Sequence, residues 1–413
     1  MKIVITNVYC YQNHGDAGIV HATVDGLRRI FPDSEITVMS LYPELDQNKY
    51  GDNVAVCAPI MRPIQQNFSS SLSKLWTVFR RGIRIAFQSV LFKVGFFPGV
   101  AKEIASADLV VSCGGGYMQA RDLKQFFVDY NVHWLQLCCA RCANTPYIIF
   151  AQTIGPFDNF SRFASRKLFK DAAGVFARES VSYEYTRRAF PGCKIKATAD
   201  VAFLLNAEKC ELPYVTYGET IKIGLTVRYW HFPGSNCGDQ LFEQYIQAIV
   251  GFIESISQEG NYAFYLMPQC VGPQEDNDLF VSRAIKDRLS DMDNVCVIDQ
   301  ELSPAELKYV YSTMDYFIGT RMHSVIFALS EKIPSIAISY DKKTDGIMAQ
   351  VGLEKYVIGI NEITSKRLVE MFHALISDHG IVDIINDSIS VISTKSWKNF
   401  EMIKDVVMES KRD

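Results

Sequence analysis

Short apolar runs alternate with longer amphipathic stretches along most of the chain. The runs are rich in β-favouring residues and end at glycine, proline or polar residues, as buried strands do. They lie at residues 3–5, 36–39, 108–113, 146–154, 174–177, 221–228, 262–267, 295–298, 316–318 and 334–340. The stretches between them have helical spacing. This alternation predicts an α/β protein with parallel sheets that are covered by helices on both faces.

The length of the chain and one polar segment predict how these elements are divided. A chain of 413 residues is too long for one compact core, so two domains are expected. Residues 206–219 are polar and turn-rich, which is typical of a linker. We therefore expect an N-terminal domain over residues 1–208 and a C-terminal domain over residues 220–387. Apolar side chains at helical spacing predict a terminal helix over residues 388–413 that packs back on the body.

The most informative stretch runs from Asp315 to Leu329. A short apolar strand ends at Gly319 and an apolar helical run begins at Val325, so the residues between them are expected to form a strand-to-helix turn that carries Arg321 and His323. The next strand leads directly to Lys343. Helix N-termini attract anions, and these cationic side chains predict a pocket for a small, multiply charged anion. The alternative is an exposed turn whose charges are simply solvated.

Two glycine-containing turns follow strands of the first half. Asn13, Gly15 and Asp16 come at the carboxyl end of the first strand, where open α/β sheets bind ligands. Asp16 could equally act as a helix cap. Gly114, Gly115 and Gly116 follow the strand at 108–113 and would let the backbone approach a ligand closely. They do not form the GxGxxG pattern, so the dinucleotide fingerprint is absent.

Residues 71–97 have a different character. On a helix, one face would carry basic and polar side chains, among them Arg80 and Arg84, and the other face would carry aromatic and apolar ones. A helix of this kind can lie in an anionic membrane surface. It can also be an ordinary helix whose apolar face packs on its own domain. Both interpretations stay open at this point.

Composition excludes several classes of protein. A formal net charge of −4 does not support general nucleic-acid binding. The chain starts with a strand rather than a signal peptide, and no apolar window is long enough for a bilayer span. The odd number of cysteines, 11, indicates a protein of the reducing cytosol. Cys139 and Cys142 form a CxxC without a second pair, so buried helical cysteines are expected rather than a metal site. We expect a cytoplasmic protein, with contact at the inner face of the membrane if residues 71–97 bind it.

Seven short motifs occur in order over nearly the whole chain. They are Asn13-x-Gly15-Asp16, Gly114-Gly115-Gly116, Gln152-Thr153-Ile154-Gly155-Pro156-Phe157, Arg178, Ile223-Gly224-x-x-Val227-Arg228, Gly319-Thr320-Arg321-Met322-His323 and Ser339-Tyr340-Asp341-x-Lys343. In this order they resemble the polysaccharide pyruvyl transferase family. The resemblance implies a GT-B-like fold, in which two Rossmann-like domains with parallel sheets face each other across a cleft and the C-terminal helix packs back on the N-terminal domain.

The resemblance also implies an activity. Members of the family transfer the enolpyruvyl unit of phosphoenolpyruvate onto two hydroxyls of a sugar, which gives a pyruvate ketal and releases phosphate. No cofactor or metal is expected. The acceptor would be a sugar of a polysaccharide or of its precursor, which is lipid-linked if residues 71–97 touch membrane. The acceptor would bind on the N-terminal side and the donor on the C-terminal side.

The resemblance also implies roles for individual residues. The matching positions for donor binding are Arg178, Arg321 and His323, with Lys343 also implied. This agrees with physical reasoning, because guanidinium groups bind carboxylate and phosphate bidentately. Arg228 would be a further anion clamp or an ion-pair partner. Ketal formation needs an acid and a base, and Asp16 and His323 are the catalytic candidates.

Two other functions are alternatives to the pyruvyl transferase. A nucleotide-sugar glycosyltransferase of the same fold would need a pocket for base and ribose, with an acidic residue for the ribose hydroxyls. The C-terminal motif is cationic and compact, which suits a small anion better. The second alternative is a non-catalytic protein that binds anions or sugars in a polymer-assembly complex.

Overall fold

The computed structural model describes residues 1–64, 71–214, 219–272 and 277–410. Part of the predicted linker, residues 215–218, and the last three residues of the predicted terminal helix lie outside this part of the chain. Contacts divide the chain into two compact units. The first contains Met1–Tyr11, Ile19–Val201 and Lys395–Asp413, and the second contains Gln12–Gly18 and Ala202–Thr394. The short segment Gln12–Gly18 therefore belongs to the second unit, although the chain enters it from the first strand.

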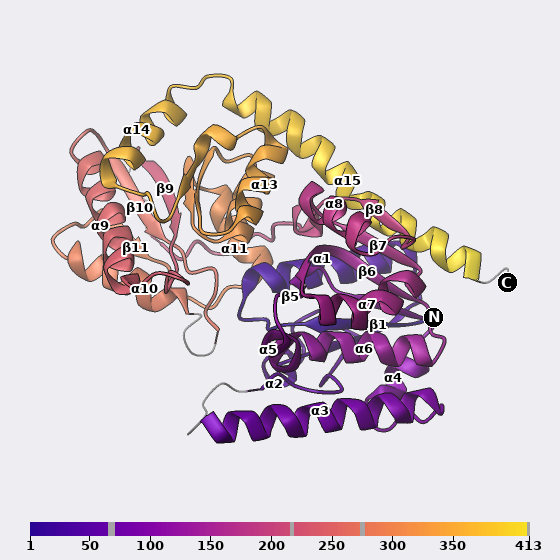
Figure 1. Ribbon diagram of the computed structural model, residues 1–413. Helices are drawn as coiled ribbons and strands as arrows, with labels where there is room; N and C mark the ends of the chain where they lie inside the picture. Colours follow the sequence, from indigo (N-terminus) through magenta and orange to yellow (C-terminus); the bar gives the residue numbers. More distant parts are fainter. Residues whose placement is uncertain (65–70, 215–218, 273–276, 411–413) are drawn as a thin grey trace. The chain divides into compact units, whose positions relative to one another are not determined.

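The first unit is built on a parallel sheet (Figure 1). Its described strands are β1 (Lys2–Val8), β2 (Glu35–Ser40), β3 (Val54–Cys57), β4 (Leu109–Ser112), β5 (Gly115–Ala120), β6 (Tyr147–Phe157), β7 (Gly174–Ala177) and β8 (Ile195–Ala197). They run in the order β3-β2-β1-β4-β6-β7-β8, and β5 pairs with β6 beside this path. The strand order reverses between β1 and β4, as in doubly wound nucleotide-binding folds.

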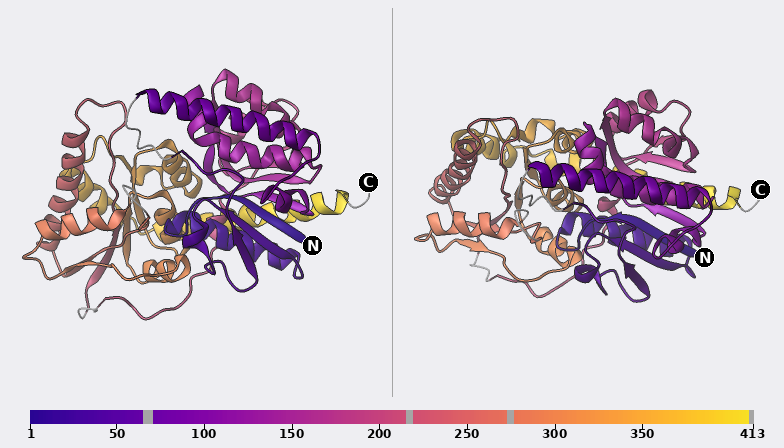
Figure 2. Two further views of the ribbon diagram at one scale, coloured as in Figure 1. Left: turned by 90° about the horizontal axis from the view of Figure 1, so that it is seen from below. Right: turned by 60° about the horizontal axis from the view of Figure 1, so that its bottom comes forward.

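Helices cover both faces of this sheet. The described helices are α1 (His14–Ile30), α2 (Pro43–Asp46), α3 (Ser71–Lys93), α4 (Ala101–Ala105), α5 (Leu123–Gln125), the π-helical turn η1 (Phe126–Tyr130), α6 (Asn131–Cys142), α7 (Asn159–Asp171), α8 (Ser180–Ala189) and the 3-10 turn η2 (Val201–Leu204). Figure 1 shows α6 between α3 and the sheet, and Figure 2 shows the full length of α3 from two further directions.

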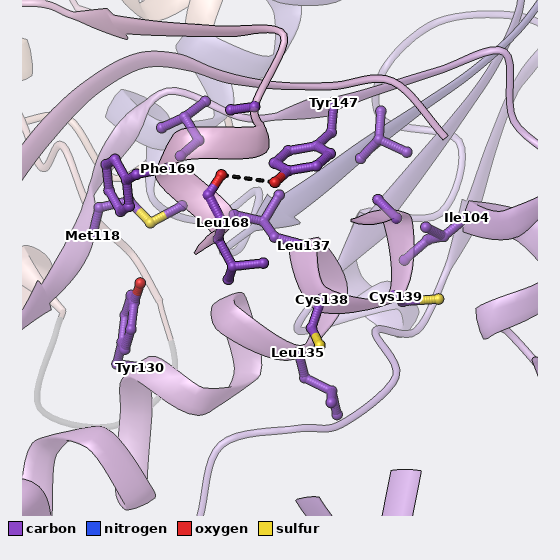
Figure 3. Packing of buried hydrophobic residues seen from close by; sticks show 14 of the residues in the cluster. Ile104, Met118, Tyr130, Leu135, Leu137, Cys138, Cys139, Tyr147, Leu168 and Phe169 are labelled. Carbon is purple, nitrogen blue, oxygen red and sulfur yellow. Dashed lines mark hydrogen bonds between the residues drawn. The ribbon is translucent and has the colours of Figure 1, made fainter. Parts of the chain in front are cut away.

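The core of the first unit lies between its sheet and α6. Leu135 and Leu137 of α6, Met118 and Phe169 all belong to this cluster of buried apolar side chains, and Figure 3 labels them. The hydroxyl of Tyr147 donates a hydrogen bond to the carbonyl of Leu168 at 2.7 Å, which satisfies the phenol inside this core. Cys139 is fully buried in the same cluster, as the helical spacing of the cysteines predicts. Buried apolar area of this kind provides most of the free energy that stabilises the unit.

The second unit repeats the architecture. Its described strands are β9 (Ile221–Thr226), β10 (Tyr262–Leu266), β11 (Val295–Val297), β12 (Tyr316–Gly319), β13 (Ser335–Ser339) and β14 (Val357–Gly359), all parallel, in the order β11-β10-β9-β12-β13-β14. Its helices are α9 (Gly238–Ser257), α10 (Asp278–Arg288), α11 (Pro304–Ser312), α12 (Met322–Ser330), α13 (Lys342–Val351), η3 (Glu354–Tyr356) and α14 (Ser365–Ile376). The order reverses between β9 and β12. The prediction of two parallel-sheet α/β domains is therefore confirmed.

The long helix α15 (Ile381–Ser410) ends the described chain. It starts seven residues before the predicted position 388, and its residues from Lys395 onward belong to the first unit. There Phe400 is fully buried, and a Cβ at Gly26 of α1 would lie 2.2 Å from its ring. The amide of Asn399 donates a hydrogen bond to the carbonyl of Ala199 at 3.1 Å. The expected packing of the terminal helix on the N-terminal domain is thus confirmed.

Candidate functional site

The strands of the second unit bring several of the predicted residues to one edge of the sheet. Gly319 pairs with Thr226 at the carboxyl ends of β12 and β9, the two strands at which the order reverses. Arg228 follows β9 and Arg321 follows β12. Ligands of open α/β sheets bind at this kind of switch point. The hydroxyl of Tyr245 lies here as well, 2.9 Å from the hydroxyl of Thr320.

Arg321 is held in place by a carboxylate that the sequence reasoning missed. Its Nη2 lies 2.6 Å from Oδ1 of Asp278, which is fully buried at the start of α10. The same carboxylate accepts backbone N–H groups from Gln269 at 3.2 Å and Cys270 at 2.9 Å. The start of a helix is also a favourable place for negative charge. Asp278 therefore fixes the orientation of the guanidinium group, and Arg321 is a buried, ion-paired residue rather than a solvated one.

His323 lies in the first turn of α12, which begins three residues earlier than the apolar run predicts. The apolar pattern does not reveal this first turn, because the residues of the turn are polar or partly exposed. Arg321, the residue before the helix, has the extended backbone of an N-cap. The imidazole of His323 packs against Gly15. A Cβ at Gly15 would lie 2.6 Å from Nδ1 of His323, so only glycine permits this approach.

The segment around Gly15 is attached to the second unit through its backbone. Asn13 and Cys270 form an isolated antiparallel bridge, and the N–H of His14 donates to the carbonyl of Gln269 at 3.1 Å. Helix α1 starts at His14, so Gly15 and Asp16 lie in its first turn, and the polar residues of this turn hide the helical pattern in the sequence. Burial lowers the pKa of His14 to about 4, so its ring is neutral near pH 7.

Asp16 and Asn13 cap α1 reciprocally. The amide of Asn13 donates to Oδ2 of Asp16 at 2.8 Å, and the N–H of Asp16 donates to Oδ1 of Asn13 at 3.4 Å. The arrangement resembles a capping box, with Asn13 as the cap and Asp16 three residues later. Asn13, and not Asp16, therefore occupies the cap position, and Asp16 supports the cap from the third residue of the helix. Both residues share the second unit with His323.

Arg228 and Lys343 complete the cationic residues of this sheet edge. The guanidinium of Arg228 lies over the rings of Tyr340, at 4.5 Å from the centroid, and Trp230, at 5.1 Å. These cation–π contacts orient the group without neutralising it. Nζ of Lys343 lies 3.5 Å from a carboxylate oxygen of Asp341, which caps α13. Stacking on aromatic rings thus adds a third possibility to the two that the sequence offered for Arg228.

Arg178 belongs to the first unit, so the structure does not group it with the residues above. It follows β7 and is 2% exposed. Nη1 lies 2.7 Å from Oδ2 of Asp200, and Nε donates to the hydroxyl of Thr153 at 2.9 Å. The carboxylate of Glu179 lies 3.5 Å away. Arg178 and the two carboxylates form a buried ionic network, and removing one member would leave an uncompensated buried charge.

The glycine motif of the first unit is partly a strand. Gly115 and Gly116 open β5, which pairs with β6, so the predicted glycine turn shortens to Cys113 and Gly114. A Cβ at Gly114 would lie 3.0 Å from Ile19 and 3.2 Å from the carbonyl oxygen of Ala151. Gly114 therefore allows the side chain of Ile19 and the backbone of Ala151 to pack closely against the chain at this point. The run of three glycines does not reveal this pairing, because strand partners are decided by tertiary structure.

A buried polar cluster that sequence reasoning missed lies at the switch point of the first sheet. The carbonyl oxygen of the Asn7 side chain accepts a hydrogen bond from Gln136 at 2.6 Å and lies 3.0 Å from Nδ1 of His133. The Asn7 amide donates to the hydroxyl of Ser112 at 2.9 Å. Burial lowers the pKa of His133 to about 3. Asn7 has a left-handed φ of 67°, a conformation that asparagine tolerates, but this angle belongs to the folded chain and the sequence carries no signal for the cluster.

No group of three or more histidine, cysteine, aspartate or glutamate side chains with metal-binding geometry occurs in residues 1–64, 71–214, 219–272 and 277–410. In the same part of the chain, the site residues form two sets. The second unit holds Asn13, Gly15, Asp16, Arg228, Gly319, Arg321, His323 and Lys343, and the first unit holds Gly114, Gly115, Gly116 and Arg178.

Known proteins resemble this chain in sequence or in fold. The chain is 24% identical over 408 residues to the amylovoran biosynthesis protein AmsJ of Erwinia amylovora, with 93% of this chain and 94% of that protein covered. Among solved structures, UDP-GlcNAc 2-epimerase from Neisseria meningitidis matches with a TM-score of 0.58 and 14% identity, covering 99% of this chain and 100% of the other. The glycotransferase of kitacinnamycin matches with a TM-score of 0.57 and 9% identity, over 98% and 99% of the two chains.

The two structural matches show a GT-B-like fold and, at such low identity, nothing about substrate. The model of the polysaccharide pyruvyl transferase family matches residues 13–342. That range starts at the Asn13 turn and ends beside Lys343, so it includes every predicted site residue except Lys343. By this match, which covers most of its length, the chain belongs to the polysaccharide pyruvyl transferase family.

Proposed function

We propose that this chain transfers the pyruvyl group of phosphoenolpyruvate to a sugar of a polysaccharide or of its lipid-linked precursor, and forms a cyclic pyruvate ketal. Membership of the family supports the reaction class, and the likeness to a protein named for amylovoran biosynthesis supports a role in exopolysaccharide synthesis. Phosphoenolpyruvate is the donor substrate in this proposal, and no further cofactor takes part.

The observation that carries the proposal is the position of Arg321 and His323 at the switch point of the second sheet. Two helix N-termini meet there, since α12 starts at Met322 and α1 starts at His14, and the Gly15 contact joins them. Their backbone N–H groups favour an anion at this place. Phosphoenolpyruvate carries a phosphate and a carboxylate, and guanidinium groups bind both. Asp278 would keep Arg321 in one orientation while the donor binds.

The chemistry needs a proton donor and a proton acceptor. C3 of the enol gains a proton from an acid and becomes a methyl group, while the first sugar hydroxyl adds to C2 and gives its own proton to a base. The second hydroxyl then adds to C2 as the bond from C2 to the phosphate oxygen breaks, and its proton leaves with the phosphate or with a base. His323 is our candidate for contact with the phosphate and Asp16 for the base, because the Gly15 contact keeps both in the second unit.

The remaining cations have supporting roles in the proposal. Arg228 and Lys343 emerge from the strands on either side of Arg321 and would add positive charge for the second anionic group of the donor. Arg178 keeps its implied role in donor binding as a proposal from the family motif. Its ion pairs with Asp200 and Glu179 mean that it would act from an already fixed position.

Calorimetric titration with phosphoenolpyruvate tests the donor site. Arg321→Lys keeps a positive charge beside the buried Asp278 and removes the guanidinium fork, so it separates donor binding from folding better than Arg321→Ala does. We expect Arg321→Lys and His323→Ala each to weaken phosphoenolpyruvate binding by about tenfold or more, with one lost charge-assisted contact worth roughly 1.5–3 kcal/mol. Lys366→Ala on the surface of α14 is the control, because Lys366 is 85% exposed. Unchanged affinity in both site variants would contradict the donor assignment.

The same titration with UDP-GlcNAc separates the rival glycosyltransferase. Tight binding of the nucleotide sugar without binding of phosphoenolpyruvate would favour that enzyme. Release of phosphate from phosphoenolpyruvate, together with the mass gain of a pyruvyl ketal on a glycan acceptor, would establish the transferase. Donor binding without turnover on any member of a broad glycan panel would favour the non-catalytic binding protein.

A further inference from the structure

Helix α3 exposes its most apolar face. Trp76, Phe79, Ile83, Phe87 and Val90 are spaced three or four residues apart, and between 55% and 62% of each is accessible to solvent. We call these five residues the α3 stripe. Trp76 and Phe79 stack with their ring centroids 5.7 Å apart. A surface helix normally buries its apolar stripe against the core, so this exposure requires an explanation.

The opposite side of α3 makes the contacts with the first unit. Ile85 and Phe92 are buried there, and the guanidinium of Arg81 donates a hydrogen bond to the side-chain oxygen of Asn131 at 2.8 Å. Gly82 faces Phe127 on the same side, at a Cβ distance of 3.7 Å. Since polar and apolar residues of that face fasten the helix to η1 and α6, the orientation of α3 leaves the stripe outside. The expected alternative, in which the aromatic face packs on its own domain, is wrong.

The chain segment that contains the stripe carries charge of one sign. Residues 53–102 contain seven lysines and arginines and no aspartate or glutamate, although the whole chain has a formal net charge of −4. Arg80 and Arg84 are exposed along one flank of the stripe, one helical turn apart. Just past the helix, Val94 is 73% exposed and Phe96 is 57% exposed, which extends the apolar surface. The polar face that the sequence predicts also includes Ser73 and Lys74, whose side chains are not among those that the structure describes.

We propose that the α3 stripe binds the surface of a membrane that contains anionic lipids. The helix has 23 residues, about 35 Å in length, and would lie in the plane of the interface with the stripe among headgroups and upper acyl chains. Tryptophan and other aromatic side chains favour this region, and Arg80 and Arg84 would pair with lipid phosphates. In the part of the chain that the structure describes, no helix is long and apolar enough to cross a bilayer, so contact of this kind stays at the surface.

A second copy of the chain fits the stripe less well. Two α3 helices packed through their stripes would bring Arg80 and Arg84 of both copies together, and the helix has no acidic residue to pair with them. Uncompensated charges of one sign oppose such an interface, whereas an anionic lipid surface compensates them. The proposal goes beyond the reaction and does not rest on it, because membrane binding is measured without donor or acceptor.

Sedimentation of the full chain with lipid vesicles tests the proposal. Vesicles of phosphatidylcholine are compared with vesicles that contain equal amounts of phosphatidylcholine and phosphatidylglycerol. We expect binding to the anionic vesicles, weakened by salt. The partition coefficient should fall about tenfold or more in Arg80→Glu/Arg84→Glu, since two groups that attract lipid phosphates are replaced by groups that repel them. Phe79→Ser/Phe87→Ser is expected to lower it similarly. Lys395→Glu/Lys398→Glu on α15 changes the net charge equally and should leave binding unchanged.

Three outcomes would overturn the proposal. One is that the unmodified chain does not sediment with anionic vesicles. Another is an equal loss in the Lys395→Glu/Lys398→Glu control, which would mean non-specific attraction. The third is a smaller sedimentation coefficient in the stripe variants without any change in vesicle binding, which would identify a second copy as the partner. Should the phenylalanine variants misfold, quenching of Trp76 fluorescence by brominated lipids in the unmodified chain, with Trp76→Phe as reference, decides the question.

Discussion

Gly15 and His323 are in direct contact, and the contact leaves no room for a side chain at residue 15. A Cβ there would lie 2.6 Å from both Cβ and Nδ1 of the imidazole. The two residues come from motifs at opposite ends of the family match, residues 13–342. Their contact brings the first turns of α1 and α12 together in the second unit. This contact assembles the proposed donor site.

Gly15→Ala should therefore damage both stability and donor binding. The added methyl group must displace the imidazole or the start of α1, and overpacking of this kind costs about 1–3 kcal/mol. Urea unfolding and phosphoenolpyruvate titration measure the two effects. Gly346→Ala in α13 is the matched control, since no atom lies within 4 Å of its Cβ position and alanine favours the helix by roughly 0.5–1 kcal/mol. Equal unfolding midpoints and equal affinities for phosphoenolpyruvate in the two variants would show that the Gly15 contact has room for a methyl group.

Arg321→Ala should unfold the second unit at a lower urea concentration. It leaves the fully buried carboxylate of Asp278 without its ion-pair partner, and breaking a buried pair costs about 3–5 kcal/mol. A double-mutant cycle with Asp278→Ala should show strong coupling between the residues. Arg283→Ala is the comparison, because Arg283 and Asp299 are each 53% exposed and such pairs contribute about 0–1 kcal/mol. A mild effect of Arg321→Ala would mean that solvent reaches Asp278.

Acid should destabilise the first unit through His133. Burial lowers the pKa of His133 from 6.5 to about 3 in the folded protein. Between these values the unfolded chain binds one more proton than the folded chain, so stability is fully present above about pH 6.5 and is lost as pH falls. One proton corresponds to roughly 1.4 kcal/mol per pH unit. His133→Phe should reduce the pH slope of the unfolding free energy by about this amount.

If His133→Phe had the same slope as the unmodified chain, the His133 ring would be taking up its proton at an ordinary pH despite its burial.

Phe400→Ala should release the end of α15 from the first unit. The ring is fully buried against Gly26 and lies 5.3 Å from the ring of Phe150, centroid to centroid. Removing a buried phenylalanine side chain costs about 3–5 kcal/mol. Hydrogen exchange of the α15 amides should become faster, and the urea midpoint should fall. Met408→Ala on the same helix changes a residue that is 52% exposed and should have little effect. Similar midpoints for both variants would contradict the packing of α15.

The alternation of apolar runs and helical stretches was sufficient to predict the two parallel sheets. Strands such as β12 and β13 are confirmed to within two residues at each end, because buried parallel strands are continuous apolar runs. Helix starts were predicted less well. Both α1 and α12 begin before their apolar runs, in polar turns that carry His14, Asp16 and His323. The first turn of a helix has no apolar periodicity to reveal it when its side chains serve caps and sites.

Partners of charged residues could not be read from the chain. Asp278 lies 43 residues from Arg321, and nothing in its neighbourhood distinguishes it from Asp287, the other acidic residue of α10. The sequence was also insufficient to predict that the α3 stripe faces solvent. An amphipathic pattern states that two faces differ, but the packing of Ile85 and Phe92 decides which face is buried.

The α/β class, the order of strands and helices, and the motifs that identify the family follow from the residues alone, because these depend on local periodicity and on residue identity. The folded chain was needed to show that the Asn13 turn joins the second unit, that Asp278 holds Arg321, and that α3 presents its aromatic side chains to solvent. These relationships join residues that are distant along the chain. They depend on the shape and packing of whole surfaces, which no local pattern of residues encodes.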